Sequence, residues 1–454
     1  MQQDLTRGPV GRTMLWFALP MILGNFLQQC YNIVDTLIVG RFLGTAALGA
    51  VGSAYTLMTF LTSVLLGLAM GSGAVFSIRW GQGDLDGLRE RVWISFVLIA
   101  LLTAVLTAAS FWGLDGILVL LQVPAENFGL MRDYLWVILW GVPATFLYNF
   151  MACLLRSVGN STAPLVFLAL AAGTNVVLDL LFVVGLSWGV QGAAGATVAA
   201  QYLSGAGLLL YGLRRCPQVR PRREHRHLAG RVAGEISQFS LLTCVQQSVM
   251  NFGILMVQGR VNSFGPTVMA AFAAAVKIDS FAYMPVQDFG NAFSTFIAQN
   301  YGAKRPERIR AGIYTAAGSV VLFCVAVSAL VCGLARPLMG LFVEAGEEEM
   351  VAIGVGYLRI EGAFYVGIGC LFLLYGFYRA VAMPGMSVVL TVFSLGTRVA
   401  LAYTLSAIPA IGVLGIWWSV PIGWFLADAV GLLYGAVWGR RFIFPRGKEG
   451  ISKI

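Results

Sequence analysis

Charged residues are scarce in this sequence. Asp, Glu, Lys and Arg make up 11% of its 454 residues, against about 25% in soluble domains, whereas 58% of the residues are hydrophobic. The mean hydropathy of +0.79 reflects the same imbalance. This composition excludes an ordinary soluble domain and predicts a polytopic membrane protein.

Histidine and cysteine are too few, and wrongly placed, for most catalytic or metal chemistry. The two histidines, His225 and His227, lie in an Arg-rich stretch, and most of the seven cysteines lie in apolar runs. There is no CxxC pair or Cys/His cluster, and an odd cysteine count disfavours a disulfide framework. HExxH, GxSxG and Walker lysine motifs are missing too. We therefore expect no enzyme, no ATP use and no cofactor.

A cleavable signal peptide is also missing, because the first apolar run is too long and no small-residue cleavage site follows it. Apolar runs of about 20 residues, which suffice to cross a bilayer, recur along the chain instead. They predict an all-α fold with twelve transmembrane helices, at residues 14–38, 47–78, 92–113, 133–153, 162–185, 190–213, 236–262, 268–299, 311–334, 354–378, 385–408 and 412–438.

Basic residues gather on one side of these spans. Of the 30 Lys and Arg residues, 23 lie on the side of the membrane that holds both termini. Two others, Lys277 and Arg398, lie within spans. The remaining five lie in the opposite loops: Arg41, Arg132, Arg260, Arg336 and Arg359. Since loops rich in Lys and Arg stay inside, both termini are expected in the cytoplasm. The net charge of +9 then reflects membrane anchoring and does not indicate nucleic-acid binding.

The chain repeats itself with a period of about 222 residues. An offset of 223 aligns Tyr134 with Tyr357 and Arg156 with Arg379. Six spans per repeat predict two parallel six-helix lobes, with substrate between them. We expect an N-terminal lobe at 1–213, an Arg-rich cytoplasmic linker at 214–235, a C-terminal lobe at 236–438 and a cytoplasmic tail at 439–454.

The first span carries a polar stripe on one face. Its residues, which fall within about a third of the helical circumference, are Asn25, Gln28, Gln29, Asn32, Asp35 and Thr36. The amides alone are equally well explained by contacts that hold helices together. A carboxylate costs roughly 2.5–3.5 kcal/mol at the membrane centre and usually marks an ion or substrate path. Asp35 therefore favours a functional site.

Two further spans bring polar groups to a similar depth. Asn175 and Asp179 are four residues apart on one face of the fifth span, and Thr197 lies two turns into the sixth. Like Asp35, all three lie near the outer surface. Two carboxylates, an amide and a hydroxyl suit a proton shared between carboxylates, or a small cation such as sodium.

The second half does not repeat this arrangement. Lys277 and Asp288 share one face of the eighth span, and Asp279 lies on another. For Lys277, Asp288 and Arg398, mutual pairing and substrate contact remain equally open. Glu361 falls near the outer membrane edge, where we expect it to be hydrated. The candidate substrate path comprises Asn25, Gln29, Asn32, Asn149, Gln247, Asn251, Lys277, Asp288 and Arg398.

These residues carry a family resemblance. The stretch from Pro20 to Asp35, the turn at 156–160 followed by Pro164, and the segment 299–304 resemble the multidrug and toxic compound extrusion (MATE) family. The resemblance covers nearly the whole chain. It implies two six-helix lobes in a V-shaped arrangement, and efflux of organic cations coupled to inward proton or sodium flow.

The fifth span sharpens the resemblance. Asn175 and Asp179 resemble the DinF-like branch of the family, which bacteria and archaea share, and this implies a prokaryotic plasma or inner membrane. The resemblance also implies that four residues match the family's cation-responsive positions in the N-terminal lobe: Asp35, Asn175, Asp179 and Thr197. Another branch places carboxylates in the seventh span, where this sequence has none.

We therefore expect a monomeric antiporter that exports amphipathic, cationic small molecules from a lipid membrane. A flippase for a lipid-linked precursor is the alternative. It should line its cavity with several cations, whereas only Lys277 and Arg398 lie inside the spans.

Overall fold

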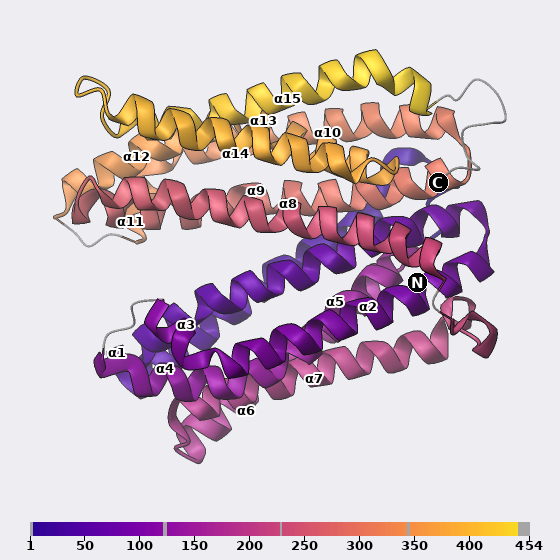
Figure 1. Ribbon diagram of the computed structural model, residues 1–454. Coiled ribbons are helices and arrows are strands. Elements are labelled where there is room, and N and C mark those ends of the chain that lie inside the picture. The colour runs from indigo at the N-terminus through magenta and orange to yellow at the C-terminus, as the bar shows by residue number, and fades with distance from the viewer. Residues whose placement is uncertain (1–2, 121–124, 228, 343–345, 444–454) are drawn as a thin grey trace. The chain divides into compact units, whose positions relative to one another are not determined.

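Helices make up the fold, and no strand occurs in residues 3–120, 125–227, 229–342 and 346–443, which the computed structural model describes (Figure 1). Residues 444–454 of the expected tail lie outside that part. The first half contains α1 (Val10–Gln82), α2 (Leu85–Trp112), α3 (Leu114–Leu120), α4 (Ala125–Ile138), α5 (Val142–Ser157), α6 (Thr162–Asp179) and α7 (Gly189–Arg215). The second half contains α8 (Gly230–Asn262), α9 (Pro266–Gly302), α10 (Pro306–Gly333), α11 (Ala335–Gly340), α12 (Glu348–Gly362), α13 (Tyr365–Ala380), α14 (Pro384–Ser406) and α15 (Leu414–Ile443).

The described residues contain 11 helical stretches long and apolar enough to cross a membrane, and the two parts of α1 on either side of Gly44 count separately among them. A twelfth span forms if α12 and α13, which meet at a bend of 51°, are taken together. This confirms the predicted all-α membrane fold and the order of its spans. The predicted first and second spans are joined in α1, which breaks at Gly44, where φ is +84°. Glycine is the residue that adopts this left-handed conformation without a Cβ clash.

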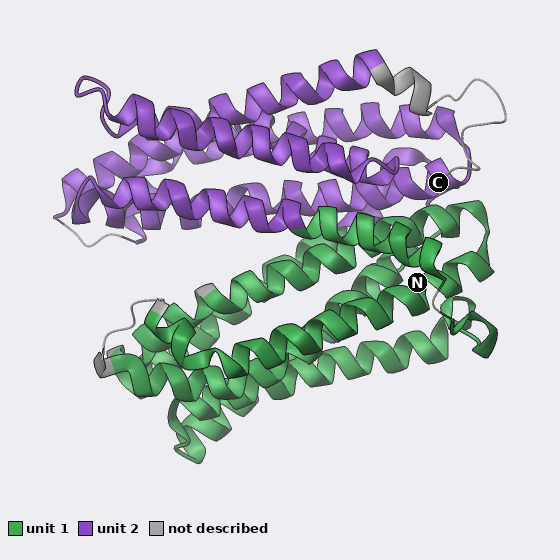
Figure 2. Cartoon of the chain, in the orientation of Figure 1, with its two compact units in different colours: residues 1–4, 19–244 green, residues 5–18, 245–454 purple. Residues whose placement is uncertain are grey.

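The chain divides into two compact units (Figure 2). Unit 1 comprises residues 1–4 and 19–244, and unit 2 comprises residues 5–18 and 245–454. The first turns of α1 thus belong to unit 2, and the first turns of α8 belong to unit 1. The repeat in the sequence does not indicate this exchange, so it needs an explanation from packing.

Close backbone packing holds the start of α8 in unit 1. A Cβ atom at Gly67 would lie 2.6 Å from Cα of Cys244, so a larger residue would push the two helices apart. Next to this contact, Oγ of Ser72 lies 2.8 Å from Oγ of Ser240 on α8. Ser95 of α2 donates to the same Ser72 hydroxyl at 2.5 Å. Small residues and a buried hydroxyl chain therefore fasten α1, α2 and α8 together.

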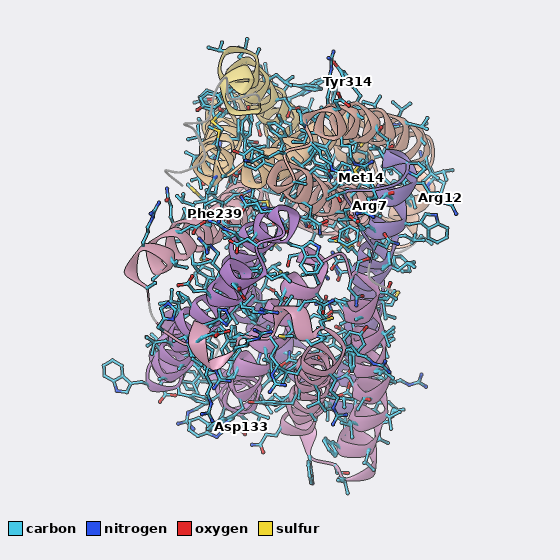
Figure 3. The ribbon with its side chains drawn as sticks, turned by 90° about the vertical axis from the view of Figure 1, so that its right-hand side faces the viewer. Arg7, Arg12, Met14, Asp133, Phe239 and Tyr314 are labelled. Atoms are coloured by element: carbon cyan, nitrogen blue, oxygen red, sulfur yellow. The ribbon has the colours of Figure 1, made fainter. Side chains whose placement is uncertain are left out.

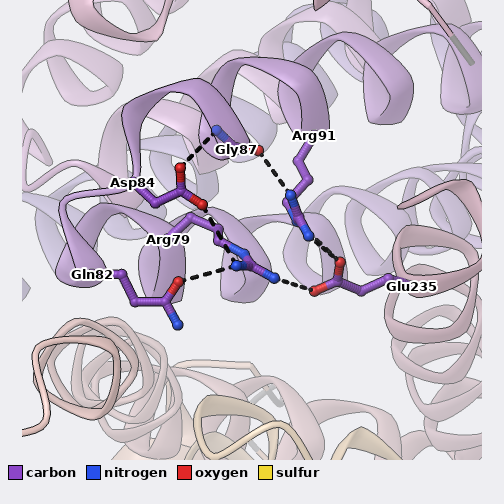
Figure 4. A network of polar contacts seen from close by, with 6 residues as sticks. All are labelled: Arg79, Gln82, Asp84, Gly87, Arg91 and Glu235. Atoms are coloured by element: carbon purple, nitrogen blue, oxygen red, sulfur yellow. Dashed lines mark hydrogen bonds and ion pairs between the residues drawn. The ribbon is translucent and has the colours of Figure 1, made fainter. Parts of the chain in front are cut away.

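An ion network lies at the end of unit 1 where α1 and α2 are connected (Figure 4). Nη2 and Nε of Arg91 lie 2.6 Å and 3.0 Å from Oε2 of Glu235 on α8. Arg79 lies 3.4 Å from the other oxygen of Glu235 and 3.6 Å from Asp84. Because the side chains of Glu235 and Arg91 are only 16% and 10% exposed, this pair is shielded from solvent. It is a second attachment of α8 to unit 1.

The N-terminal segment, in which Figure 3 labels Arg7 and Met14, belongs to unit 2 and is held there through its backbone carbonyl oxygens. Arg308 of α10 donates to the carbonyl oxygens of Gly8, Arg7 and Leu5 at 2.7 Å, 3.1 Å and 3.2 Å. Met14 is fully buried. One guanidinium thus donates to three carbonyl groups that precede α1. Because charge-assisted hydrogen bonds are stronger than neutral ones, this contact holds the segment firmly.

The Arg-rich linker packs against α2 in unit 1. His225 is buried, with Nε2 3.3 Å from Oδ1 of Asp86, and Nε2 of His227 lies 3.1 Å from Oε1 of Glu90. The guanidinium of Arg226 lies 5.3 Å from the ring centre of Trp93. Cys216 is buried as well, and burial raises the pKa of its thiol. The linker is therefore a packed part of unit 1.

Candidate functional site

Two carboxyl groups meet inside unit 1. Asp35 lies on α1, and Asp179 is the last residue of α6, where the helix changes to π-helical turns at Leu180–Gly185. The two side chains face each other, and Asp179 is completely buried. Within the described ranges, Oδ1 of Asp35 and both carboxyl oxygens of Asp179 are buried and make no hydrogen bond. π-Helical turns often lie at functional sites. The backbone next to Asp179 and the carboxyl oxygens without hydrogen bonds therefore both indicate a functional site here.

An amide and a hydroxyl complete the predicted set. Asn175 lies one turn before Asp179 on α6, and its Nδ2 donates to Oγ1 of Thr197 on α7 at 3.3 Å. Both side chains are buried, and Oδ1 of Asn175 makes no hydrogen bond within the described part of the chain. The structure therefore brings Asp35, Asn175, Asp179 and Thr197 together from α1, α6 and α7.

Two tyrosines that sequence reasoning missed lie beside this set. Tyr31, one turn before Asp35 on α1, faces Asp35, Asp179 and Thr197. Tyr134 on α4 is buried and faces both carboxyl groups. Helical spacing from Asp35 could have indicated Tyr31. The match between Tyr134 and Tyr357 in the repeat was the available signal for Tyr134.

The charge balance of this site is unusual. In the described residues, the groups that act on the two carboxyls are acidic or neutral, and none is basic. Two ionised carboxylates in a buried site repel each other, and neither has a counter-charge. Such a site is suited to hold a proton or a small cation between the two groups.

Several of the other polar residues predicted for the substrate path in the first half make hydrogen bonds within their own helices. Nδ2 of Asn32 donates to Oε1 of Gln29 at 3.3 Å, so these two amides satisfy each other on α1. Asn25 is half-buried on the same helix. Asn149 donates to the carbonyl oxygen of Thr145 in its own helix at 2.9 Å. The amide nitrogen of Asn149 is therefore already hydrogen-bonded within its own helix.

In unit 2 the candidate path residues separate. Gln247 and Asn251 are half-buried on α8, Lys277 is exposed on α9, and Asp288 is buried three turns further along α9. Eleven residues of helix span about 16 Å, so Lys277 and Asp288 do not pair directly.

Arg398 lies beside Asp279 and Glu361. Glu361, expected at a hydrated edge, is 1% exposed. That expectation was wrong because α12 begins at Glu348, about 20 Å of helix before Glu361.

Comparisons with known proteins agree with this architecture. The chain is 28% identical to "Probable multidrug resistance protein YpnP" of Bacillus subtilis (strain 168) over 95% of its length and 96% of that protein. It is 27% identical to "Probable multidrug resistance protein YoeA" of the same strain, covering 97% of each. A solved structure of a MOP superfamily transporter from Pyrococcus furiosus Vc1 (DSM3638) superimposes with a TM-score of 0.90 at 23% identity, covering 96% of this chain and 98% of that one.

The family model described as MatE matches residues 20–181 and 240–404, which together make up most of the chain and of its described helices. The first match includes Asp35, Asn175 and Asp179, and the second includes Asp279, Glu361 and Arg398. With the helical architecture and the relatives above, this establishes that the chain belongs to the MatE family of membrane transporters.

Proposed function

We propose that this transporter exports amphipathic organic cations in exchange for protons or sodium ions, and that Asp35 and Asp179 are its coupling groups. The observation that carries the proposal is the pair of facing carboxyl groups in unit 1, where Asp179 is buried, Asp35 is half-buried, and neither has a basic neighbour in the described residues. The names of its relatives, "Probable multidrug resistance protein" in both cases, support the substrate class.

The coupling follows from charge. When the pair holds a proton or a sodium ion, its repulsion is relieved and the site is stable in a buried state. When the ion leaves, the pair becomes two adjacent anions that require water or another cation. Asn175 and Thr197 position the site, because they hydrogen-bond to each other and Oδ1 of Asn175 makes no hydrogen bond in the described part of the chain. Each charge that moves down 100 mV yields about 2.3 kcal/mol, which is enough to drive uphill export.

The polar stripe of α1 is proposed as the nearby part of the substrate path. Asn25, Gln29 and Asn32 lie on the same helix as Asp35, so a substrate that contacts them also reaches the coupling pair. Met and aromatic side chains supply adaptable apolar contact. The protein works as a monomer among membrane lipids and without ATP.

Transport into inverted vesicles tests the proposal. A fluorescent organic cation should accumulate when either a pH gradient or a sodium gradient is applied, and collapse of the gradient should release it. Vesicles with the Asp35→Asn variant should show no gradient-driven accumulation. A transporter that ignores both gradients, or that moves a fluorescent lipid between leaflets with equal efficiency, would support the flippase alternative.

We also propose that both termini and the linker lie in the cytoplasm of a prokaryotic plasma or inner membrane. Cys216 is a poor reporter of this topology because it is buried and its raised pKa keeps the thiol protonated at neutral pH. Arg223 is exposed in the same linker. With the native cysteines replaced, Arg223→Cys should resist a membrane-impermeant thiol reagent in intact cells and react after permeabilisation. Labelling in intact cells would invert the topology.

A further inference from the structure

The Arg-rich linker carries more positive charge than its own contacts use. Residues 214–235 contain seven arginines and two acids, Glu224 and Glu235. Nη1 of Arg222 lies 3.6 Å from Oε1 of Glu224, and Arg226 lies over a tryptophan ring of α2. The other five arginines are exposed, and their guanidinium groups make no ion pair within the described residues: Arg214, Arg215, Arg220, Arg223 and Arg231. The linker therefore presents a positively charged surface.

The acids beside the linker cannot neutralise this surface, because they already have basic partners. Oδ1 of Asp86 on α2 lies 2.7 Å from Nη1 of Arg89 and 3.3 Å from Nε2 of His225. Oε1 of Glu90, one turn further along α2, lies 3.1 Å from Nε2 of His227. The two glutamates of the linker have arginine partners as well. An anion that binds the five exposed arginines must come from outside the described chain.

The backbone that carries these arginines is packed in place. Nε of Arg89 donates to the carbonyl oxygen of Gln218 at 2.9 Å. Cys216, Val219 and His225 are buried between the exposed positions. A flexible basic tail loses backbone freedom when it binds, whereas this segment is already ordered. The linker is therefore preorganised to bind an anionic surface.

The place of the linker in the chain indicates which anions it meets. Arg215 is the last residue of α7, which is long and apolar enough to cross a membrane, so the linker begins at the membrane surface. Clusters of Lys and Arg next to the cytoplasmic end of a membrane helix attract anionic lipid headgroups. The planar fork of a guanidinium also matches two oxygens of a phosphate group.

We propose that the exposed linker arginines bind the phosphate groups of anionic phospholipids, of which phosphatidylglycerol is the test case. The leaflet involved rests on the cytoplasmic placement of the linker proposed above. The binding itself is measured below on purified protein, without a gradient, a substrate or a sealed membrane. Failure of that measurement leaves the transport and topology proposals intact, and their failure leaves it interpretable.

A diffuse attraction between the membrane and every basic residue near it is the competing explanation. The connection between α9 and α10 offers the comparison, because Lys304 and Arg310 are exposed there too. Arg305 and Arg308 of the same connection donate to backbone carbonyl oxygens of the N-terminal segment, and Glu307 lies among them. A diffuse attraction treats the two regions alike, whereas a binding surface on the linker does not.

The experiment counts the lipids that remain bound to full-length detergent-purified protein in native mass spectrometry. Phosphatidylglycerol and phosphatidylcholine with the same acyl chains are added in equal amounts. We expect the wild type to retain phosphatidylglycerol in preference. Arg220→Gln with Arg223→Gln should lower the affinity for phosphatidylglycerol about 25-fold, about fivefold for each arginine. Equal retention of the two lipids by the wild type would overturn the proposal.

Two further variants separate the linker surface from general charge and from misfolding. Lys304→Gln with Arg310→Gln removes the same charge from the other connection and should leave the preference unchanged. An equal loss in this control contradicts the proposal in favour of diffuse attraction. Arg220→Lys with Arg223→Lys keeps the charge and should retain most of the preference. A loss as large as that of the glutamine pair would mean that charge does not cause the binding, and the proposal would fall.

Nucleic acid is the other polyanion that an arginine cluster attracts. A short oligothymidylate, added at the same concentration as the lipid, should leave the bound phosphatidylglycerol in place. Displacement of the lipid by the oligonucleotide would assign the surface to nucleic acid and overturn the proposal.

Discussion

Each unit brings two carboxyl groups close together, and the two units differ in the groups that surround each pair. In unit 1, Asp35 and Asp179 face each other with an amide and a hydroxyl nearby, and no basic group acts on them in the described residues. In unit 2, Asp279 and Glu361 have Arg398 beside them. A pair without a basic neighbour requires an ion from outside to balance two negative charges, whereas in unit 2 the charge of Arg398 acts on both carboxyl groups. The two carboxyl pairs therefore differ in whether the charge of an arginine acts on them.

A tyrosine common to both sites shows that the units still share a scaffold. Tyr134 faces the pair in unit 1, and Tyr357 donates to Glu361 in unit 2. The two tyrosines are 223 residues apart, which is the offset of the sequence repeat. The carboxylates themselves do not follow this offset. The repeat thus places a buried tyrosine at the same position in both units, whereas the acidic groups lie at positions that do not correspond.

The largest effect is expected from the pair in unit 1. Asp35→Asn and Asp179→Asn keep side-chain size and remove a charge, so each should abolish gradient-driven export while leaving folded protein in the membrane. Because the two groups act as a unit, the double variant should be no worse than either single one. Vesicle transport measures this, with Asp115→Asn as control, since Asp115 is exposed and pairs with Arg132. Substantial export by either single variant would mean that other acidic residues, such as Asp279 and Glu361, couple export to the ion gradient.

Removal of the arginine in unit 2 should have the next largest effect. Arg398→Gln leaves two buried carboxyl groups without a cation, and loss of one partner in a buried charged cluster costs about 3–5 kcal/mol. Folded protein in the membrane should fall sharply, and Glu361→Gln in the same chain should partly restore it. Lys277→Gln, at an exposed position of the same unit, should leave the amount unchanged. If Arg398→Gln folds normally, the guanidinium does not balance this pair.

The attachment of α8 to unit 1 should give an intermediate effect. Glu235→Gln weakens the shielded contacts with Arg91 and Arg79, and hydrogen bonds to charged groups contribute about 2 kcal/mol. Thermal unfolding of the purified protein should begin at a lower temperature. Glu348→Gln in unit 2 is the matched control, because its pair with Arg336 is mostly exposed and should contribute nothing measurable. Equal shifts in the two variants would mean that burial does not matter here.

The smallest effect is expected at the amide and hydroxyl of unit 1. Asn175→Ala and Thr197→Val each remove the same hydrogen bond of 3.3 Å, which is worth about 1 kcal/mol. The proton or sodium concentration that half-activates export should rise about fivefold in each, by the usual conversion of free energy to affinity. The double variant should match the single ones. An effect of Asn175→Ala alone would assign the role to its free Oδ1 atom.

The pair in unit 1 could be predicted from the sequence because the depth of each residue in the membrane could be estimated. Asp35, Asp179 and Thr197 lie at similar distances from the ends of three spans that the apolar runs define, so the sequence indicated that they share a level in the membrane. The pair in unit 2 was missed for a matching reason. A span predicted at 354–378 puts Glu361 near its start, whereas α12 begins at Glu348 and bends into α13 by 51°.

By itself, the sequence determined the membrane helices and the positions of their acidic residues, because hydropathy and helical spacing are local properties of the chain. Only the tertiary structure decided which acids meet, and which pair has Arg398 beside it, because the net charge of a buried site depends on side chains from helices far apart in sequence. It also decided that α1 and α8 each begin in the other unit. That exchange rests on the close approach at Gly67 and on the carbonyl contacts of Arg308, and neither leaves a periodic signal in the sequence.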